Sequence, residues 1–273
     1  MRQLKKILKM LLPPIIVDLF KSNKPSEYGF FTGYQSFAEA ASHAGGYNSE
    51  EIFHKVKNAL LKVKSGEAVF ERDSVLFQDI IYSWPLLTGL LFSVALNKRN
   101  ALNILDFGGS LGSSYFQNRR FLEKLNHVNW NIVEQAHFID CGKTYFADDR
   151  LRFFYTIEEC FQNQKPETLL LASVLQYFEK VDEILIHLLS FNFSVIIIDR
   201  TPFTTRSHHI PALQKVPPSI YNASYPAWLL SKDRIYELIT NNGYYLHAEF
   251  DAIGGRESLF EYKGAIFIRN GIK

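Results

Sequence analysis

From residue 103 onward, short apolar and β-branched runs alternate with amphipathic stretches. Such runs are typical of strands, and the stretches between them carry helical spacing. We predict seven strands, at Asn103–Phe107, Trp130–Glu134, Arg152–Tyr155, Thr168–Ala172, Ser194–Asp199, Tyr244–Phe250 and Ala265–Arg269. Five helices are predicted near residues 112–126, 135–147, 157–164, 180–190 and 231–242. This alternation indicates a parallel sheet covered by helices.

The last two predicted strands are joined differently. Residues 251–264 contain Gly254 and Gly255 and show no helical pattern. A connection without a helix makes a hairpin, so one strand runs antiparallel to the others. The predicted fold is therefore α/β, a Rossmann-like doubly wound sheet of seven strands, mostly parallel with one antiparallel strand.

Residues 30–99 carry helical rather than strand periodicity. Helical spacing begins at Phe37, and Ser49 followed by two acidic residues is typical of a helix start. The stretch from Ile81 to Phe92 is apolar nearly all round, which predicts a helix buried against a sheet and kinked at Pro85. We therefore divide the chain into an N-terminal helical accessory segment, residues 1–100, packed on a main domain of residues 101–273.

Composition excludes several classes of protein. Hydrophobic residues make up 47% of the chain, enough apolar area to exclude a disordered protein. Thirty basic and 28 acidic side chains leave a net charge of +2, which indicates no nucleic-acid partner. Cys141 and Cys160 are too few for a disulfide framework and have no zinc-ligand spacing. A cytoplasmic location and the absence of a metal site are expected.

Residues 1–24 hold most of the basic excess, with six basic groups and one acidic group. Their apolar run is broken by Pro13 and Pro14 and is far shorter than the ~20 residues of a membrane span. We interpret residues 4–12 as a short amphipathic helix that packs on the domain. A weak peripheral contact of residues 1–24 with the inner membrane surface is the alternative. Nothing in the sequence specifies an oligomeric state.

The strongest functional signal follows the first predicted strand, where Asp106-Phe-Gly-Gly-Ser-Leu-Gly112 leads into a helix. Glycines in such a turn let the backbone approach a ligand, and the helix start presents free N–H groups above the strand ends. The dinucleotide pattern G-x-G-x-x-G would need glycine at positions 110 and 113, and both are serine. NAD binding is therefore not expected.

Two carboxylates indicate a different cofactor. Asp106 precedes the turn and suits a cationic ligand, whereas Glu134 ends the second strand, where it can accept hydrogen bonds from both hydroxyls of a ribose. An acid, a glycine-rich turn and a second acid in this order resemble the class I S-adenosylmethionine-dependent methyltransferases. The resemblance implies that Asp106 lies beneath the methionine part of the cofactor and that Glu134 binds its ribose. The turn under the methionine part would comprise Gly108, Gly109, Ser110 and Gly112.

Two further strand ends complete the cofactor site that this resemblance implies. Tyr155 and Thr156, at the end of the third strand, occupy the position that faces the adenine in family members. Ser173, at the end of the fourth strand, would border the methionine part.

Almost the whole chain is similar to a group of bacterial methyltransferases encountered among surface-polysaccharide genes. The motifs that carry this resemblance are the segments 12–15, 29–40, 46–47, 72–74, 106–112 and 199–202. It implies a small-molecule or glycan acceptor, namely a sugar, a sugar phosphate or a related decoration.

Candidate catalytic residues lie at and after the end of the fifth strand. Asp199, His208 and His209 are candidates for removing the proton of an acceptor hydroxyl. For a phosphate oxygen, which is already anionic, a cation such as Arg200 or Arg206 would matter more. The residues expected to contact the acceptor are Tyr34, Gln176, Tyr177, Arg200, Arg206 and Tyr225. The acceptor is expected between the loop of residues 199–228 and the part around Tyr34.

Two alternatives stay open. A noncatalytic binding or scaffold protein of a glycan assembly system could retain this fold with a degenerate site, but the intact Asp106 and Glu134 count against it. A nucleotide-sugar dehydrogenase or epimerase is disfavoured because G-x-G-x-x-G and a Tyr-x-x-x-Lys pair are both missing.

Overall fold

The computed structural model describes residues 27–45, 49–72, 74–218, 220 and 223–272. In these residues the larger of two sheets has ten strands. The smaller sheet is a hairpin of β2 (Phe70–Arg72) and β3 (Val75–Phe77). The helix predicted at residues 4–12 and the membrane contact expected of residues 1–24 lie outside the described residues.

The centre of the larger sheet holds all seven predicted strands, in the order β6-β5-β4-β7-β8-β12-β11. Their bounds are β4 (Ala101–Phe107), β5 (His127–Val133), β6 (Leu151–Phe154), β7 (Thr168–Ala172), β8 (Val195–Thr204), β11 (Tyr244–Arg256) and β12 (Glu261–Arg269). Strand β12 runs antiparallel to both neighbours, β8 and β11, whereas β4 to β8 pair in parallel. The predicted Rossmann-like α/β fold with one antiparallel strand is confirmed.

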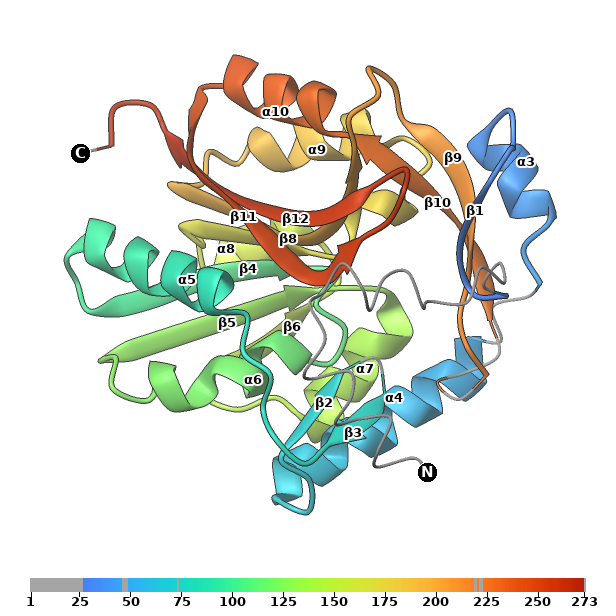
Figure 1. The fold of residues 1–273 in the computed structure, drawn as a ribbon. Helices are drawn as coiled ribbons and strands as arrows, with labels where there is room; N and C mark the ends of the chain where they lie inside the picture. The colour runs from blue at the N-terminus through green and yellow to red at the C-terminus, as the bar shows by residue number, and fades with distance from the viewer. Residues whose placement is uncertain (1–26, 46–48, 73, 219, 221–222, 273) are drawn as a thin grey trace, which may run out of the picture.

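Helices cover both faces of this sheet (Figure 1). On one face lie α4 (Ser49–Ser65), α5 (Trp84–Asn97), α6 (Ser113–Leu122) and α7 (Ala136–Tyr145). On the other lie α8 (Ile157–Asn163), α9 (Val181–Leu189) and α10 (Lys232–Asn241). Neighbouring residues of one strand supply different cores, since Ile104 packs with the first group of helices and Leu105 with the second. The five helices predicted after residue 103 are all present.

Helix α5 begins at Trp84, so Pro85 lies in its first turn rather than at a kink. The predicted kink is wrong because the first-turn N–H groups of a helix have no helical partner, so proline loses nothing there. Gly89 of α5 packs on the sheet so closely that a Cβ there would lie 3.0 Å from Cδ1 of Ile197.

The N-terminal part is not only helical, because it also contributes strands. Strand β1 (Gly29–Thr32) pairs antiparallel with β9 (Ile210–Lys215), and β9 pairs antiparallel with β10 (Ser224–Ser231). Helix α3 (Phe37–Ser42) packs beside these strands (Figure 1). The sequence predicted a loop over residues 199–228, and this is wrong, because β8, β9 and β10 take up most of that segment. Through β10, which pairs with the end of β8, this edge extends the central sheet.

Candidate functional site

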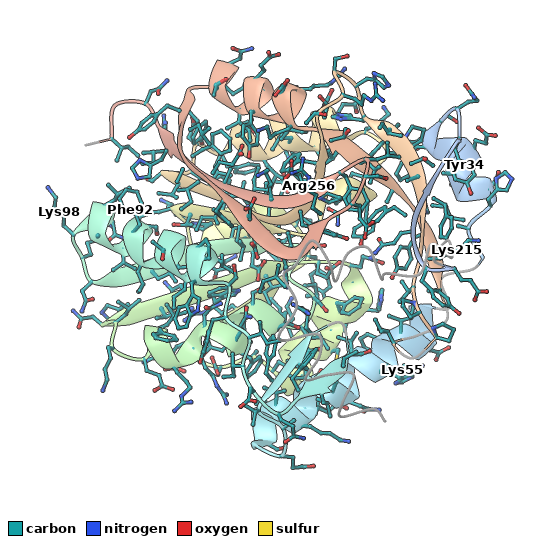
Figure 2. The ribbon with its side chains drawn as sticks, viewed as in Figure 1. Tyr34, Lys55, Phe92, Lys98, Lys215 and Arg256 are labelled. Atoms are coloured by element: carbon teal, nitrogen blue, oxygen red, sulfur yellow. The ribbon has the colours of Figure 1, made fainter. Side chains whose placement is uncertain are left out.

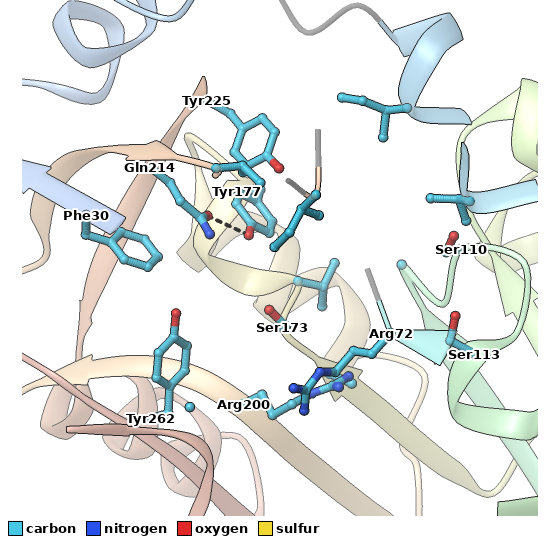
Figure 3. Close-up of a pocket in the computed structure, with 18 of the residues that line it drawn as sticks. Phe30, Arg72, Ser110, Ser113, Ser173, Tyr177, Arg200, Gln214, Tyr225 and Tyr262 are labelled. Atoms are coloured by element: carbon cyan, nitrogen blue, oxygen red, sulfur yellow. Dashed lines mark hydrogen bonds between the residues drawn. The ribbon is translucent and has the colours of Figure 1, made fainter. Parts of the chain in front are cut away.

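The carboxyl ends of β4, β5, β7 and β8 open onto a cavity of about 1480 Å³. The glycine turn and Glu134 line one side of it, which we call the turn side. The other side, which we call the strand side, is lined by Tyr177 and by residues of β1, β9, β10 and β12. Figure 3 shows residues of both sides around this cavity. Ligand sites in doubly wound sheets lie at the same ends of the strands.

The glycine turn is packed so tightly that it excludes larger side chains. A Cβ at Gly109 would lie 2.6 Å from Cγ of Asp106, and one at Gly108 would lie 2.2 Å from Cγ2 of Val174. Gly108 also has a φ of 73°, in the left-handed region that favours glycine. The turn thus rests directly on the Asp106 carboxylate.

Asp106 is 1% exposed and accepts a hydrogen bond from Nε1 of Trp130 at 2.9 Å. Burial raises the pKa of its carboxyl to about 7, while the Trp130 hydrogen bond and the Arg200 charge oppose that rise. A bound cation would shift this pKa down, because an opposite charge nearby favours the ionised carboxylate.

Glu134 lies beside the turn at the end of β5. The backbone N–H of Gln135 donates to one carboxylate oxygen at 2.9 Å, and that of Ser110 donates to the other at 3.3 Å. These bonds fix the carboxylate, while burial raises its pKa. Each oxygen keeps a further lone pair for a ligand hydroxyl, because an ionised carboxylate has about four acceptor positions.

A β-bulge aims Arg200 into the cavity. Strand β12 pairs Lys263 with Thr201 and Ala265 with Ile198, so Asp199 and Arg200 together oppose one residue. Arg200 has a φ of 48°, which is uncommon for a residue with a side chain. Bulges re-aim side chains in this way and recur beside functional sites.

The strand side is aromatic and polar. The Tyr177 hydroxyl donates to Oε1 of Gln214 at 2.8 Å, and the rings of Tyr177 and Tyr225 meet edge to face with centroids 5.6 Å apart. Phe30 is the register partner of Gln214 on the neighbouring strand, and Figure 3 shows it beside this group with Tyr262 below. Apolar ring faces with a few fixed polar groups are typical of small-molecule sites.

The hairpin of β2 and β3 adds Glu71, Arg72 and Ser74 to the cavity wall, and sequence analysis did not select them as contacts. Glu71 is 1% exposed and accepts hydrogen bonds from the Ser113 hydroxyl and, at 3.1 Å, from the Ser74 backbone N–H. The hairpin is therefore joined to the start of α6. The segment 72–74 was noted only as a motif, since no local pattern shows that it folds over the turn.

Ten of the predicted site residues line this one cavity. They are Asp106, Gly108, Gly109, Ser110, Glu134, Tyr155, Ser173, Tyr177, Arg200 and Tyr225. They come from the ends of five parallel strands, β4 to β8, and from β10, so the fold brings together what the sequence separates.

Three residues that were predicted to contact a ligand support the fold instead of lining the cavity. Gly112 is the N-cap of α6, where a Cβ would meet Leu151 at 3.2 Å. Thr156 caps α8 by accepting from the backbone N–H of Glu159, and it does not line the cavity. Gln176 is 1% exposed and donates to the Ser173 hydroxyl at 2.9 Å, so it supports a lining residue without lining the cavity itself.

The two histidines do not line the cavity, which corrects their interpretation as catalytic bases. His208 is exposed. His209 accepts from the Ser231 backbone N–H at 2.9 Å through Nδ1, and its Nε2 lies 3.4 Å from Asp182. With Nδ1 an acceptor, the proton of the neutral ring sits on Nε2, so both nitrogens are occupied. Burial lowers the pKa of His209.

Tyr34, Asp199 and Arg206 are also outside the cavity lining. The ring of Tyr34 packs near His43, with centroids 5.3 Å apart, and Figure 2 places it beside α3. Asp199 is fully buried, and burial raises its pKa. Arg206 is exposed after β8. Of the residues expected around the acceptor, Tyr34 and the two histidines thus lie outside the cavity lining, whereas Tyr177, Arg200 and Tyr225 line it.

Among the described residues no group of three or more metal-type side chains could hold a metal ion. In the same part of the chain, no helix combines the length and apolar character needed to cross a membrane. Cys141 and Cys160 are both buried as free thiols.

Comparisons with known proteins found no matching family model and no matching curated protein. Solved structures with a similar fold were found. A 1,6-didemethyltoxoflavin-N1-methyltransferase from Burkholderia thailandensis has 10% identity over 91% of this chain and 98% of its own, with a TM-score of 0.46. An S-adenosylmethionine-dependent methyltransferase from Clostridium acetobutylicum has 9% identity over 70% and 93%, with a TM-score of 0.45. The N-terminal domain of EvdMO1, solved with SAH and D-fucose, has 14% identity over 82% and 99%, with a TM-score of 0.46.

Proposed function

We propose that this chain is an S-adenosylmethionine-dependent methyltransferase that methylates an oxygen of a sugar, a sugar phosphate or a related surface-polysaccharide decoration. The observation that carries the proposal is the pairing of Asp106 and Glu134 on the two flanks of the glycine turn, at the edge of one cavity with a second, differently lined side. These residues fit the cofactor, since a fixed carboxylate suits ribose hydroxyls and a buried one suits a cationic group.

The size of the cavity supports a reaction of two ligands. Sites for one drug-sized ligand hold roughly 300–1,000 Å³, and this cavity holds about 1480 Å³. Asp106, the turn and Glu134 would hold S-adenosylmethionine, which when bound supplies an electrophilic methyl group on its sulfonium. Tyr177, Tyr225 and Gln214 would then position the acceptor on the strand side.

For such a transfer the main contribution of this chain is to place the acceptor oxygen and to exclude water. The aromatic side chains would cover the apolar faces of a sugar ring, while the fixed Gln214 amide offers a hydrogen bond to a hydroxyl. The lining residues include no histidine within the described part of the chain.

The test is binding of S-adenosylhomocysteine by calorimetry to the wild type, to Glu134→Ala and to Glu183→Ala as a control. Glu183 is a surface carboxylate on α9 whose side chain is 70% exposed. Loss of two ribose hydrogen bonds to a charged group should weaken binding by roughly tenfold to a hundredfold in Glu134→Ala, with no change in the control. Equal affinity in all three proteins would reject the proposal, and binding without turnover on any glycan acceptor would favour a noncatalytic role.

A further inference from the structure

Two arginines from distant parts of the chain line the same cavity. Arg72 ends β2 in the hairpin, and Arg200 lies in the bulge of β8. Figure 3 shows both guanidinium groups pointing into the cavity, near Ser173 in that view. Neither position belongs to the glycine turn or to the Glu134 strand end.

Neither guanidinium is saturated by the protein. Arg72 forms no ion pair with any carboxylate of the described residues, and its Cζ lies 5.7 Å from the centroid of the Phe77 ring. Nε of Arg200 is 3.4 Å from Oδ2 of Asp199 but makes no hydrogen bond to it. Nε of Arg200 is buried without a hydrogen-bond partner, which costs free energy that a ligand oxygen would recover. Arg72 is half-buried in the cavity wall, so its guanidinium can donate to the same ligand.

The fold fixes the backbone from which each arginine projects. Glu71, adjacent to Arg72, is buried and bonded to Ser113 and to the Ser74 backbone. The backbone of Arg200 is set by the bulge and its positive φ. Fixed attachment points lower part of the entropy cost of binding, because only the side chains remain to be ordered.

We propose that Arg72 and Arg200 together bind an oxyanion of the methyl acceptor, a phosphate or a carboxylate, and so restrict the substrate class to anionic acceptors. The inference rests on the proposed function, which assigns the turn side of the cavity to the cofactor. Planar guanidinium groups donate paired hydrogen bonds that match the oxygens of phosphate and carboxylate.

The experiment titrates glucose 1-phosphate, glucuronate and uncharged glucose into protein saturated with S-adenosylhomocysteine, by calorimetry. We expect one of the charged sugars to bind at least about tenfold more tightly than glucose, the strength of a charge-assisted hydrogen bond. Tighter binding of glucose 1-phosphate would identify the bound group as a phosphate, and tighter binding of glucuronate would identify it as a carboxylate. Arg72→Gln and Arg200→Gln should each remove that preference, whereas Arg72→Lys and Arg200→Lys should retain part of it. Arg206→Gln changes an exposed arginine outside the cavity and should bind like the wild type.

Two results would overturn the inference. One is equal or undetectable binding of all three sugars to the wild type up to about 10 mM, a very weak affinity. The other is a tenfold loss of S-adenosylhomocysteine affinity in Arg72→Gln or Arg200→Gln, because the arginines would then serve the cofactor. Failure of the wild type to bind S-adenosylhomocysteine at all would instead reject the proposed function. Thermal unfolding of each variant shows whether it is folded. If a glutamine variant is unfolded, the sugar preference of the corresponding lysine variant tests the inference in its place.

Discussion

The two sides of the cavity are built in different ways. The turn side comes from residues close in sequence, with Asp106, Gly108, Gly109 and Ser110 in one segment and Glu134 at the next strand end. The strand side and its arginines come from segments as far apart as β1, the hairpin, the bulge, β9, β10 and β12. Under the proposed function, the local arrangement would serve the cofactor, which stays the same, and the assembled one would let acceptor contacts vary without disturbing it. This is how function is generally carried on a shared fold.

The largest expected effect comes from Gly109→Ala, which should break the turn side alone. A Cβ there would overlap the Asp106 carboxylate at 2.6 Å, so the turn or the carboxylate must move. We expect S-adenosylhomocysteine affinity to fall by at least about a hundredfold, or about 2.7 kcal/mol.

Gly45→Ala is the matched control, because a Cβ at Gly45 would meet only the Ser224 hydroxyl at an ordinary 3.5 Å. Calorimetry on both variants measures the difference. Full affinity in Gly109→Ala would show that the cofactor does not rely on this turn.

Asp106→Asn tests the turn side through the pH dependence of the free energy of unfolding. Burial raises the pKa of Asp106 to about 7 from 3.8, so the folded protein keeps a proton that the unfolded chain releases. The free energy of unfolding therefore falls as pH rises between about 4 and 7, by at most about 1.4 kcal/mol per unit, and levels off above 7.

The variant lacks this titration, so its stability relative to the wild type should increase with pH across the same window. Its side-chain oxygen can still accept from Trp130. Urea unfolding at several pH values measures the difference, and parallel curves for the two proteins would count against a raised pKa.

The difference between the turn side and the strand side also explains which parts of the site could be predicted from the sequence. The seven central strands are long local apolar runs, and the turn has its own glycine signal. Strands β9 and β10 contain Pro211 and Pro226, which weaken any strand pattern but are tolerated near the edge of a sheet. Pairing of Phe31 with Leu213 and the bulge at Arg200 depend on contacts between distant segments, so no local window shows them.

A smaller effect is expected of His209→Ala, which should lower stability without affecting the reaction. His209→Ala removes the acceptor for the Ser231 N–H, so we expect a loss of about 1–3 kcal/mol in the free energy of unfolding. Because burial lowers the pKa of this histidine, the stability that it contributes is complete above about 6.5 and decreases as pH falls below that value.

Cofactor affinity and turnover of His209→Ala should stay within about twofold of the wild type, since His209 does not line the cavity. Denaturant unfolding and kinetics on the same sample test both points. A large loss of turnover at unchanged stability would restore its role as a base.

The smallest effect is expected of His208→Ala. This side chain is exposed and outside the cavity lining, so stability should change by less than about 0.5 kcal/mol. Thermal unfolding and a turnover assay are sufficient, and a clear decrease in either would contradict the position that the structure gives it.

A crystal structure of the protein with S-adenosylhomocysteine tests the division of the cavity most directly. The account predicts the ribose hydroxyls on the Glu134 carboxylate and the methionine part over Gly109 and Asp106, with Arg72 and Arg200 left open to a second ligand. A ligand lying instead among Tyr177, Tyr225 and Tyr262, away from Glu134, would contradict it.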